Sequence, residues 1–253
     1  MKKAPFLAAL FALTLFATDF WQSKPFTEWN PKEVQKILQN SPWSKSFSVS
    51  GGNGGVTSAG ERGRARSHDT EPDPGQISAT SNGPAGASDP GGLGRYAGSR
   101  GDPGTESSAV PMIDLVVRWQ SSLPVRQAIV KEKYGSEAGT SEAAKKALDT
   151  PLDHYIIAVG GLPGSAVAGD ADALKQSVLP HTSLSVKGKP ALKPDDLAVQ
   201  KSGRVFELLL AFPKTTPITE ADREVEFTAK IGGFSIRQKF RLKDMALGGK
   251  LDL

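Results

Sequence analysis

The chain has 253 residues, three histidines and no cysteine. The lack of cysteine excludes a disulfide framework, a thiol nucleophile, thiolate metal sites and lipid attachment through an N-terminal cysteine. The formal net charge is +4, but Lys2 and Lys3 belong to a leader, and the remaining 29 basic and 27 acidic residues nearly balance. No basic cluster stands out, so the composition predicts no nucleic-acid partner.

The N-terminus has the pattern of a secretion signal. Two lysines precede a 12-residue apolar run, Phe6 to Ala17, which ends at Thr18. A basic region followed by an apolar run of this length is typical of a signal peptide, and the run is too short for a membrane-spanning helix, which needs about 20 residues. We therefore expect removal of residues 1–17 and export to the periplasm or the medium, with no transmembrane segment in the mature protein. A buried N-terminal helix is the alternative.

A helix and a strand are predicted between the leader and residue 50. Asn30 is the expected N-cap, with Pro31 at the first helical position and Glu33 three residues after the cap. Apolar residues at helical spacing follow until an Asn-Ser-Pro sequence ends the helix. Polar and apolar residues then alternate over 46–50, which is typical of a half-buried strand.

Three of the four tryptophans, Trp21, Trp29 and Trp43, lie in this short segment. So short a segment cannot bury three indoles by itself, and each large aromatic side chain contributes about 2–3 kcal/mol when buried. We therefore expect residues 18–50 to dock on the domain that follows. The alternative is that these three side chains form an exposed surface that binds a protein or glycan partner.

Residues 51–110 differ in composition from the rest of the chain. They hold 15 of the 27 glycines, together with eight serines and five prolines. Such a stretch buries too little apolar surface to offset the entropy of ordering, so disorder is predicted. A strand is predicted on each side of it, and if the two strands pair, residues 51–110 are a loop inserted in one domain, which chain entropy tolerates.

Residues 111–253 predict an α+β domain. The clearest element is a β-hairpin, in which alternating strands at 224–231 and 234–242 flank the two-residue turn Gly232-Gly233. We expect one discontinuous domain with an antiparallel C-terminal sheet, for which a β-sandwich is one arrangement, and a few short helices. The other predicted elements are strands at 112–119, 155–159, 183–187, 197–200 and 205–212, and helices beginning near 121 and covering 141–148 and 171–179.

A glycine-rich stretch at 160–169 follows a predicted strand and precedes a predicted helix. Gly164 and Gly169 have the spacing of a phosphate-binding loop, but Asp170-Ala171 stand where that loop has Lys and Ser or Thr. An acidic residue at that point would repel a phosphate. We therefore interpret residues 160–169 as a flexible surface loop and predict no cofactor.

The histidines supply no recognisable site either. His68 lies in the glycine-rich segment, and His154 and His181 have no second ligand at metal-binding spacing. A catalytic triad of one of these two with Ser165 and an aspartate remains open, because triads are defined by geometry and not by order. No catalytic or metal-binding residue is predicted.

Three blocks of the sequence carry a family resemblance. They are DFW to SPW at 19–43, VRWQS with PVRQA at 117–128, and FRLKDM to GKLDL at 240–253. In these blocks the chain resembles a group of uncharacterised exported bacterial proteins with no assigned activity, which also carry a variable glycine-rich stretch. The resemblance implies an ordered scaffold and no functional residues.

The expected function is a non-enzymatic envelope or secreted protein that binds a protein or glycan partner. The alternative is an extracytoplasmic hydrolase or transferase with a site near His154 or His181.

Overall fold

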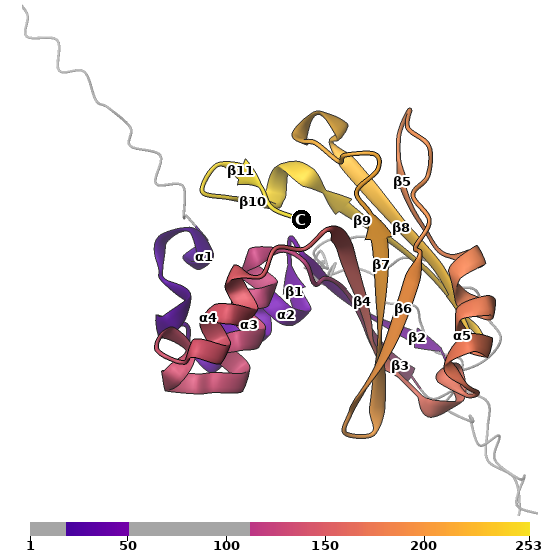
Figure 1. The fold of residues 1–253 in the computed structure, drawn as a ribbon, viewed down its shortest axis with the longest axis horizontal. Coiled ribbons are helices and arrows are strands. Elements are labelled where there is room, and N and C mark those ends of the chain that lie inside the picture. The colour runs from indigo at the N-terminus through magenta and orange to yellow at the C-terminus, as the bar shows by residue number, and fades with distance from the viewer. Residues whose placement is uncertain (1–18, 51–111) are drawn as a thin grey trace, which may run out of the picture. The chain divides into compact units, whose positions relative to one another are not determined.

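The computed structural model describes residues 19–50 and 112–253 (Figure 1). The predicted signal peptide and the predicted disordered segment 51–110 lie outside the described residues. Within the described part, helices and antiparallel sheets both contribute, which confirms the α+β prediction.

The larger sheet has six antiparallel strands in the order β1-β2-β3-β4-β7-β6. β2 lies before the segment 51–110 and β3 lies after it, and the two pair along their whole length, with Phe47 opposite Leu115. The strands flanking that segment therefore belong to one sheet. The bounds are Asn40–Ser41 for β1, Ser44–Ser50 for β2, Met112–Trp119 for β3, His154–Leu162 for β4, Asp196–Ser202 for β6 and Val205–Pro213 for β7.

The smaller sheet has three antiparallel strands in the order β5-β8-β9. Ile231 pairs with Phe234 across the Gly232-Gly233 turn, so the predicted hairpin is confirmed. A minor hairpin near the C-terminus was not predicted. The bounds are Ser183–Val186 for β5, Glu224–Ile231 for β8, Phe234–Arg241 for β9, Ala246–Leu247 for β10 and Lys250–Leu251 for β11.

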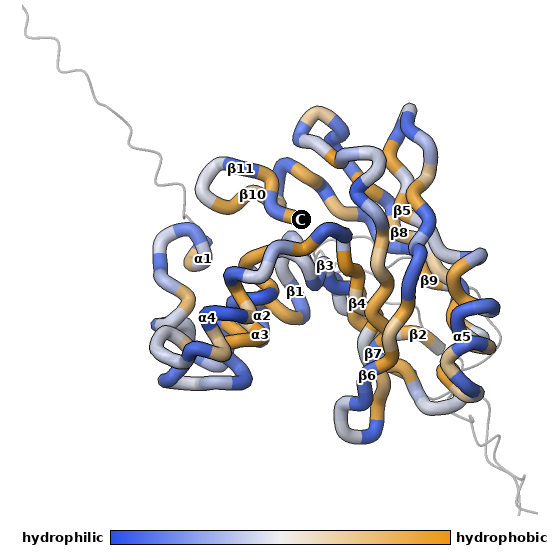
Figure 2. The backbone as a smooth tube through the Cα atoms, in the orientation of Figure 1, coloured by the Kyte–Doolittle hydropathy of each residue, from blue (hydrophilic) through white to orange (hydrophobic). Residues whose placement is uncertain are grey.

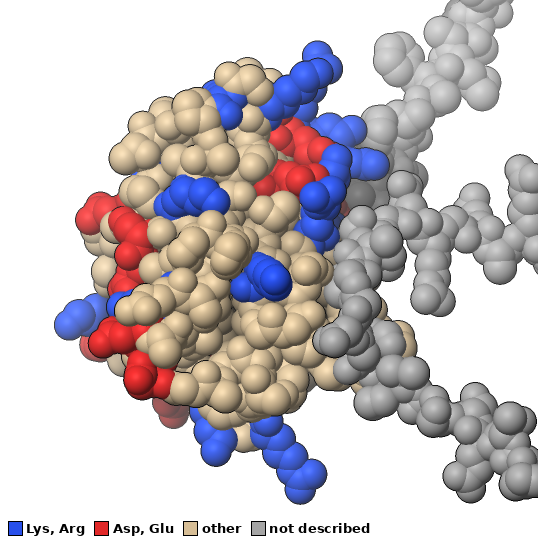
Figure 3. Space-filling view, turned by 90° about the vertical axis from the view of Figure 1, so that its right-hand side faces the viewer, with Lys and Arg blue, Asp and Glu red and all other residues tan. Residues whose placement is uncertain are grey.

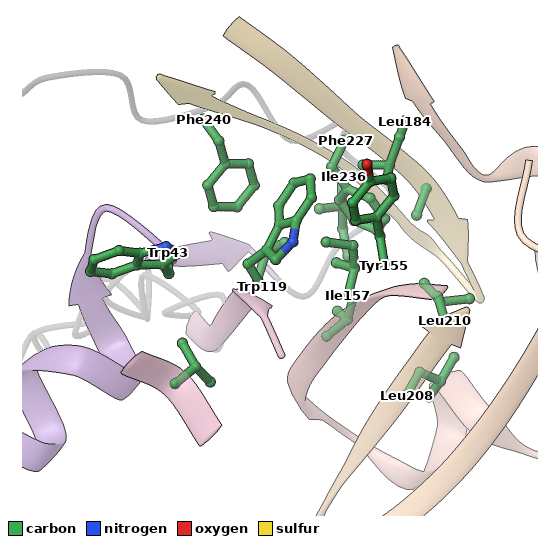
Figure 4. Close-up of a cluster of buried hydrophobic side chains, with 14 of the residues drawn as sticks. Trp43, Trp119, Tyr155, Ile157, Leu184, Leu208, Leu210, Phe227, Ile236 and Phe240 are labelled. Atoms are coloured by element: carbon green, nitrogen blue, oxygen red, sulfur yellow. The ribbon is translucent and has the colours of Figure 1, made fainter. Parts of the chain in front are cut away.

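The two sheets pack face to face around one hydrophobic core. Phe212 of β7 meets Phe227 of β8 edge-to-face, with ring centroids 6.4 Å apart. The ring of Trp119 lies between those of Phe240 and Tyr155, at 5.7 and 5.9 Å (Figure 4). Buried residues alternate with more exposed ones along β3, β7, β8 and β9, so each of these strands gives one face to this core. The antiparallel C-terminal sheet is thus one layer of a sheet-on-sheet arrangement.

Five helices are described. The start of α2 agrees with the prediction: Asn30 Oδ1 accepts the Glu33 N–H, and the Glu33 carboxylate accepts the Asn30 N–H, which is a capping box. Helices α2, α3 and α4 gather at one end of the molecule and α5 lies at the other (Figure 1). The bounds are Phe20–Ser23 for α1, Pro31–Gln39 for α2, Leu123–Tyr134 for α3, Glu142–Asp149 for α4 and Ala171–Val178 for α5.

Helix α5 shows how helical periodicity directs packing. Hydrophobic and hydrophilic residues alternate along it (Figure 2), and its two buried residues, Leu174 and Val178, are four positions apart. The side chain of Asp170 accepts the Ala173 N–H at 2.7 Å and caps the helix. A carboxylate therefore already occupies the N-terminus where a phosphate would bind.

The prediction of a surface loop at 160–169 is wrong for its first residues. Strand β4 continues to Leu162, and its register against β7 shifts between Val159 and Leu162. Gly161 has φ +84°, and a Cβ there would lie 2.1 Å from the Asp114 carbonyl oxygen. Glycine is required at this irregularity because only glycine fits both the backbone conformation and the close approach.

Candidate functional site

The structure places the three N-terminal tryptophans inside the protein. Trp21, Trp29 and Trp43 are 7%, 3% and 0% exposed. The rings of Trp21 and Trp43 meet edge-to-face at 5.9 Å, and Trp43 Nε1 donates to the Asp252 carbonyl oxygen at 2.9 Å. The expectation that these indoles pack in a core is therefore confirmed. The alternative, an exposed surface formed by all three, is wrong because all three side chains are buried; Trp29 also borders a surface hollow.

That hollow is a groove between the start of α2 and the end of α3, with a volume of about 440 Å³. Trp29, Pro31 and Val34 supply its apolar wall, and the end of α3 supplies the opposite wall. A volume in this range accommodates a large side chain or a small ligand. The residues on the groove are Trp29, Pro31, Val34, Gln35, Lys131, Glu132, Gly135 and Ser136.

The apolar wall is held in place by the turn before α2. Trp29 Nε1 donates to the Lys24 carbonyl oxygen at 3.1 Å, and the indole packs edge-to-face against Phe20 and Phe26. Lys24 Nζ lies 2.8 Å from Glu33 Oε2. The Lys24 hydrogen bond, and then the Asn30 N–H, lower the pKa of the Glu33 carboxyl and so favour the ionised form that accepts both hydrogen bonds. The indole therefore has one fixed orientation.

The opposite wall is tied to the first by long-range hydrogen bonds. Lys131 Nζ donates to the Thr27 carbonyl oxygen at 2.5 Å and to that of Gly135 at 3.0 Å. Gln35 Nε2 donates to Glu132 Oε1 at 2.8 Å and so bridges α2 and α3. Because these polar groups already bond to each other, the groove is formed without a ligand and would lose little entropy on binding one.

The groove carries few groups that could react with a ligand. Its lining includes one hydroxyl, Ser136, and one carboxylate, Glu132, but no histidine. Within residues 19–50 and 112–253, no group of three or more acidic or histidine side chains is arranged to hold a metal ion. An apolar wall with a narrow polar rim is suited to receiving one hydrophobic group and orienting it.

The two histidines of the alternative function lie elsewhere. His154, at the start of β4, has Nε2 3.1 Å from Asp195 Oδ2, and both side chains are largely solvated. His181 lies exposed in the turn after α5. Among the described residues, no serine hydroxyl bonds to either imidazole, and Ser165 lies in a separate exposed turn. His154 and Asp195 thus correspond to two members of a catalytic triad, and no serine among the described residues is bonded to His154 as the nucleophile.

Next to this pair lies a second ion pair, in which Lys175 of α5 approaches Asp196 of β6 at 2.6 Å. The Lys175 hydrogen bond, followed by the Leu197 N–H, lowers the pKa of the Asp196 carboxyl. On the face that includes this side of the molecule, charges of both signs are interspersed and form no continuous basic patch (Figure 3).

Comparisons with family models, curated proteins and solved structures find no match for the chain. None of the helices in the described ranges is long and apolar enough to cross a membrane.

Proposed function

We propose that this chain is a non-enzymatic protein of the cell envelope or the secreted fraction, and that it binds a protein partner through the α2–α3 groove. The observation that carries the proposal is the pre-formed hollow of about 440 Å³ with Trp29 in its wall. Trp29 is 3% exposed, so its indole shapes the base of the hollow, and the exposed ring of Pro31 adds apolar surface that a partner can contact. The apolar run Phe6 to Ala17 supports export.

A protein partner fits the groove better than a glycan does. The wall formed by Trp29, Pro31 and Val34 presents carbon atoms, and the ammonium of Lys131 is already bonded to two carbonyl groups. Few polar atoms are left to replace the hydration of a sugar. A hydrophobic side chain of a partner would instead gain about 25 cal/mol for each Å² of apolar surface that it buries.

Site-directed photo-crosslinking tests this proposal in the cells that produce the protein. A photoreactive phenylalanine analogue replaces Ser136 on the groove rim, and the matched control carries it at Ser235 on the exposed face of β9. We expect a discrete protein adduct from position 136 and none from position 235. Equal adducts from both positions, or none from position 136, would refute the groove as the binding surface.

The identified partner is then purified and its affinity is measured. Ser136→Trp fills the groove with an indole, whereas Ser235→Trp adds the same bulk elsewhere. We expect Ser136→Trp to weaken the affinity at least about tenfold, which corresponds to about 1.4 kcal/mol, and Ser235→Trp to leave it unchanged. Unchanged affinity in both variants, with both folded, contradicts the proposal.

N-terminal sequencing of the mature protein tests export, for which a start near Thr18 is expected.

A further inference from the structure

A second hollow lies on the outer face of the six-stranded sheet, away from the core. It has a volume of about 390 Å³ and forms where the end of α2 approaches β2 and β3. Unlike the α2–α3 groove, its exposed side chains are mostly polar: an amide from Gln39, hydroxyls from Ser46 and Ser48, and a carboxylate from Asp114. Val116 supplies an apolar patch beside them.

The register of β2 and β3 explains why these groups meet. β2 reads SKSFSVS, so Ser44, Ser46 and Ser48 recur at every second position and share one face of the sheet. Ser46 is paired with Val116 and Ser48 with Asp114. On this face, Val116 leans over β4, because a Cβ on Gly160 would lie 3.0 Å from Val116 Cγ1. The hollow thus combines a polar wall with a small apolar floor.

Internal hydrogen bonds use only part of the polar capacity of the hollow. Ser48 Oγ donates to Asp114 Oδ1 at 2.5 Å, and Ser46 Oγ donates to the Gln39 carbonyl oxygen at 2.8 Å. Gln39 Nε2 donates to Gln35 Oε1 at 2.8 Å. Asp114 Oδ2, Gln39 Oε1 and the hydroxyl lone pairs have no other partner among the described residues. The unused capacity is therefore mainly that of hydrogen-bond acceptors.

Acceptors in this number select a ligand that brings several donors. An anionic ligand would meet the Asp114 carboxylate, and neither lysine nor arginine lines the hollow. An apolar side chain would strip water from these acceptors without replacing their hydrogen bonds, which costs free energy. A neutral sugar presents O–H donors on its edges and C–H groups on one face, and matches both the polar wall and Val116.

We propose that this hollow binds a neutral sugar unit, with Asp114 and Gln39 accepting ligand hydroxyls and Val116 contacting the C–H face of the ring. The site is separate from the α2–α3 groove, so either proposal can fail without the other.

The test is an NMR titration of the full-length ¹⁵N-labelled chain with glucose, N-acetylglucosamine and glucuronate, each to high millimolar concentration. We expect saturable shifts of the amides of residues 46–48 and 114–116 with at least one of the two neutral sugars, and weaker binding of glucuronate because its carboxylate faces Asp114. No saturable shift with either neutral sugar, shifts confined to other surfaces, or tighter binding of glucuronate would overturn the proposal.

Variants separate a specific site from weak surface contact. Asp114→Ala and Gln39→Ala remove the two main acceptors, and Asp172→Ala removes an exposed carboxylate from α5 as the control. We expect Asp114→Ala to weaken binding about tenfold or more, as for a hydrogen bond to a charged group, Gln39→Ala to weaken it less, and Asp172→Ala to have no effect. Equal affinity in Asp114→Ala and Asp172→Ala would refute the assignment.

Discussion

Trp43 and Trp119 form a natural matched pair for testing how the core is stabilised. Both side chains are fully buried. Both rings meet an aromatic neighbour edge-to-face, with the centroids of Trp43 and Trp21 5.9 Å apart and those of Trp119 and Phe240 5.7 Å apart. They differ in the ring N–H. Trp43 donates to the Asp252 carbonyl oxygen at 2.9 Å, whereas Trp119 Nε1 has no hydrogen-bond partner among the described residues.

Replacing each tryptophan with phenylalanine removes the same atoms, so the loss of buried apolar surface is similar in the two variants. Trp43→Phe also leaves a partly buried carbonyl group without its donor, which costs about 1–3 kcal/mol. Trp119→Phe removes a buried N–H that makes no hydrogen bond, and so relieves a cost of the same kind. We therefore expect Trp43→Phe to be less stable than Trp119→Phe by at least about 2 kcal/mol, the sum of the lower ends of these two contributions.

Urea unfolding at pH 7, followed by circular dichroism, measures this difference. The slope of the free energy against urea concentration should be the same for both variants, which shows that the unfolded states are comparable. For a chain of this size, a 2 kcal/mol difference corresponds to about 4–8 °C in Tm. If Trp119→Phe is destabilised as much as Trp43→Phe, or more, the argument from hydrogen-bond satisfaction is wrong.

Three further predictions concern single positions. Burial raises the pKa of the Asp252 carboxyl above its ordinary 3.8. The stability that its neutral form provides is therefore present below that value and is lost as the pH rises through the folded pKa. In urea unfolding, the stability of Asp252→Asn relative to the natural protein should be higher at pH 7 than at pH 3, and an unchanged difference would contradict this. Gly161→Ala should reduce the soluble yield or lower Tm far more than Gly203→Ala, because both have positive φ but only Gly161 has backbone within 2.1 Å of the added Cβ. The side chains of Glu207 and Arg118 form an ion pair and are 16% and 13% exposed. Glu207→Leu should lower the free energy of unfolding in urea by about 3 kcal/mol, and adding Arg118→Leu should recover part of this loss. A double variant less stable than Glu207→Leu would refute this.

The elements that the sequence predicts well are those with a local cause. The start of α2 follows from Asn30, Pro31 and Glu33, which lie within four residues of each other. The β8–β9 hairpin follows from strict alternation on both sides of Gly232-Gly233. In these cases one chemical pattern, read over a few residues, is enough to specify the backbone.

Placement of strands between the two sheets has no such local cause. β5 and β6 are separated by nine residues, yet β5 joins β8 and β6 joins β7. Alternation along a strand shows which face is buried, but not against which sheet. The continuation of β4 to Leu162 was missed for a related reason: two consecutive glycines usually indicate a turn, and here they form an irregularity inside the strand.

The groove and the burial of the tryptophans depend on contacts that are distant in the sequence. Gln35 and Glu132 are 97 positions apart, Lys131 and Thr27 are 104 apart, and Trp43 and Asp252 are 209 apart. The aromatic composition of residues 18–50 predicted that the indoles must pack, and the structure shows which part of the chain covers them. Trp29 borders the groove, and nothing in its sequence neighbourhood distinguishes it from Trp21.

The same long-range contacts explain why the groove keeps its shape without a ligand. At one end of α3, Asp252 Oδ1 accepts the Leu123 N–H at 2.7 Å; at the other, Lys131 bonds to the turn that carries Trp29. Helix α3 is therefore fixed at both ends to segments that are remote in sequence, and α2 is fixed by its capping box. Because both helices are fixed to other segments and Gln35 also bonds to Glu132 across them, their spacing is set without a ligand, and the apolar wall beside Trp29 stays available to a partner.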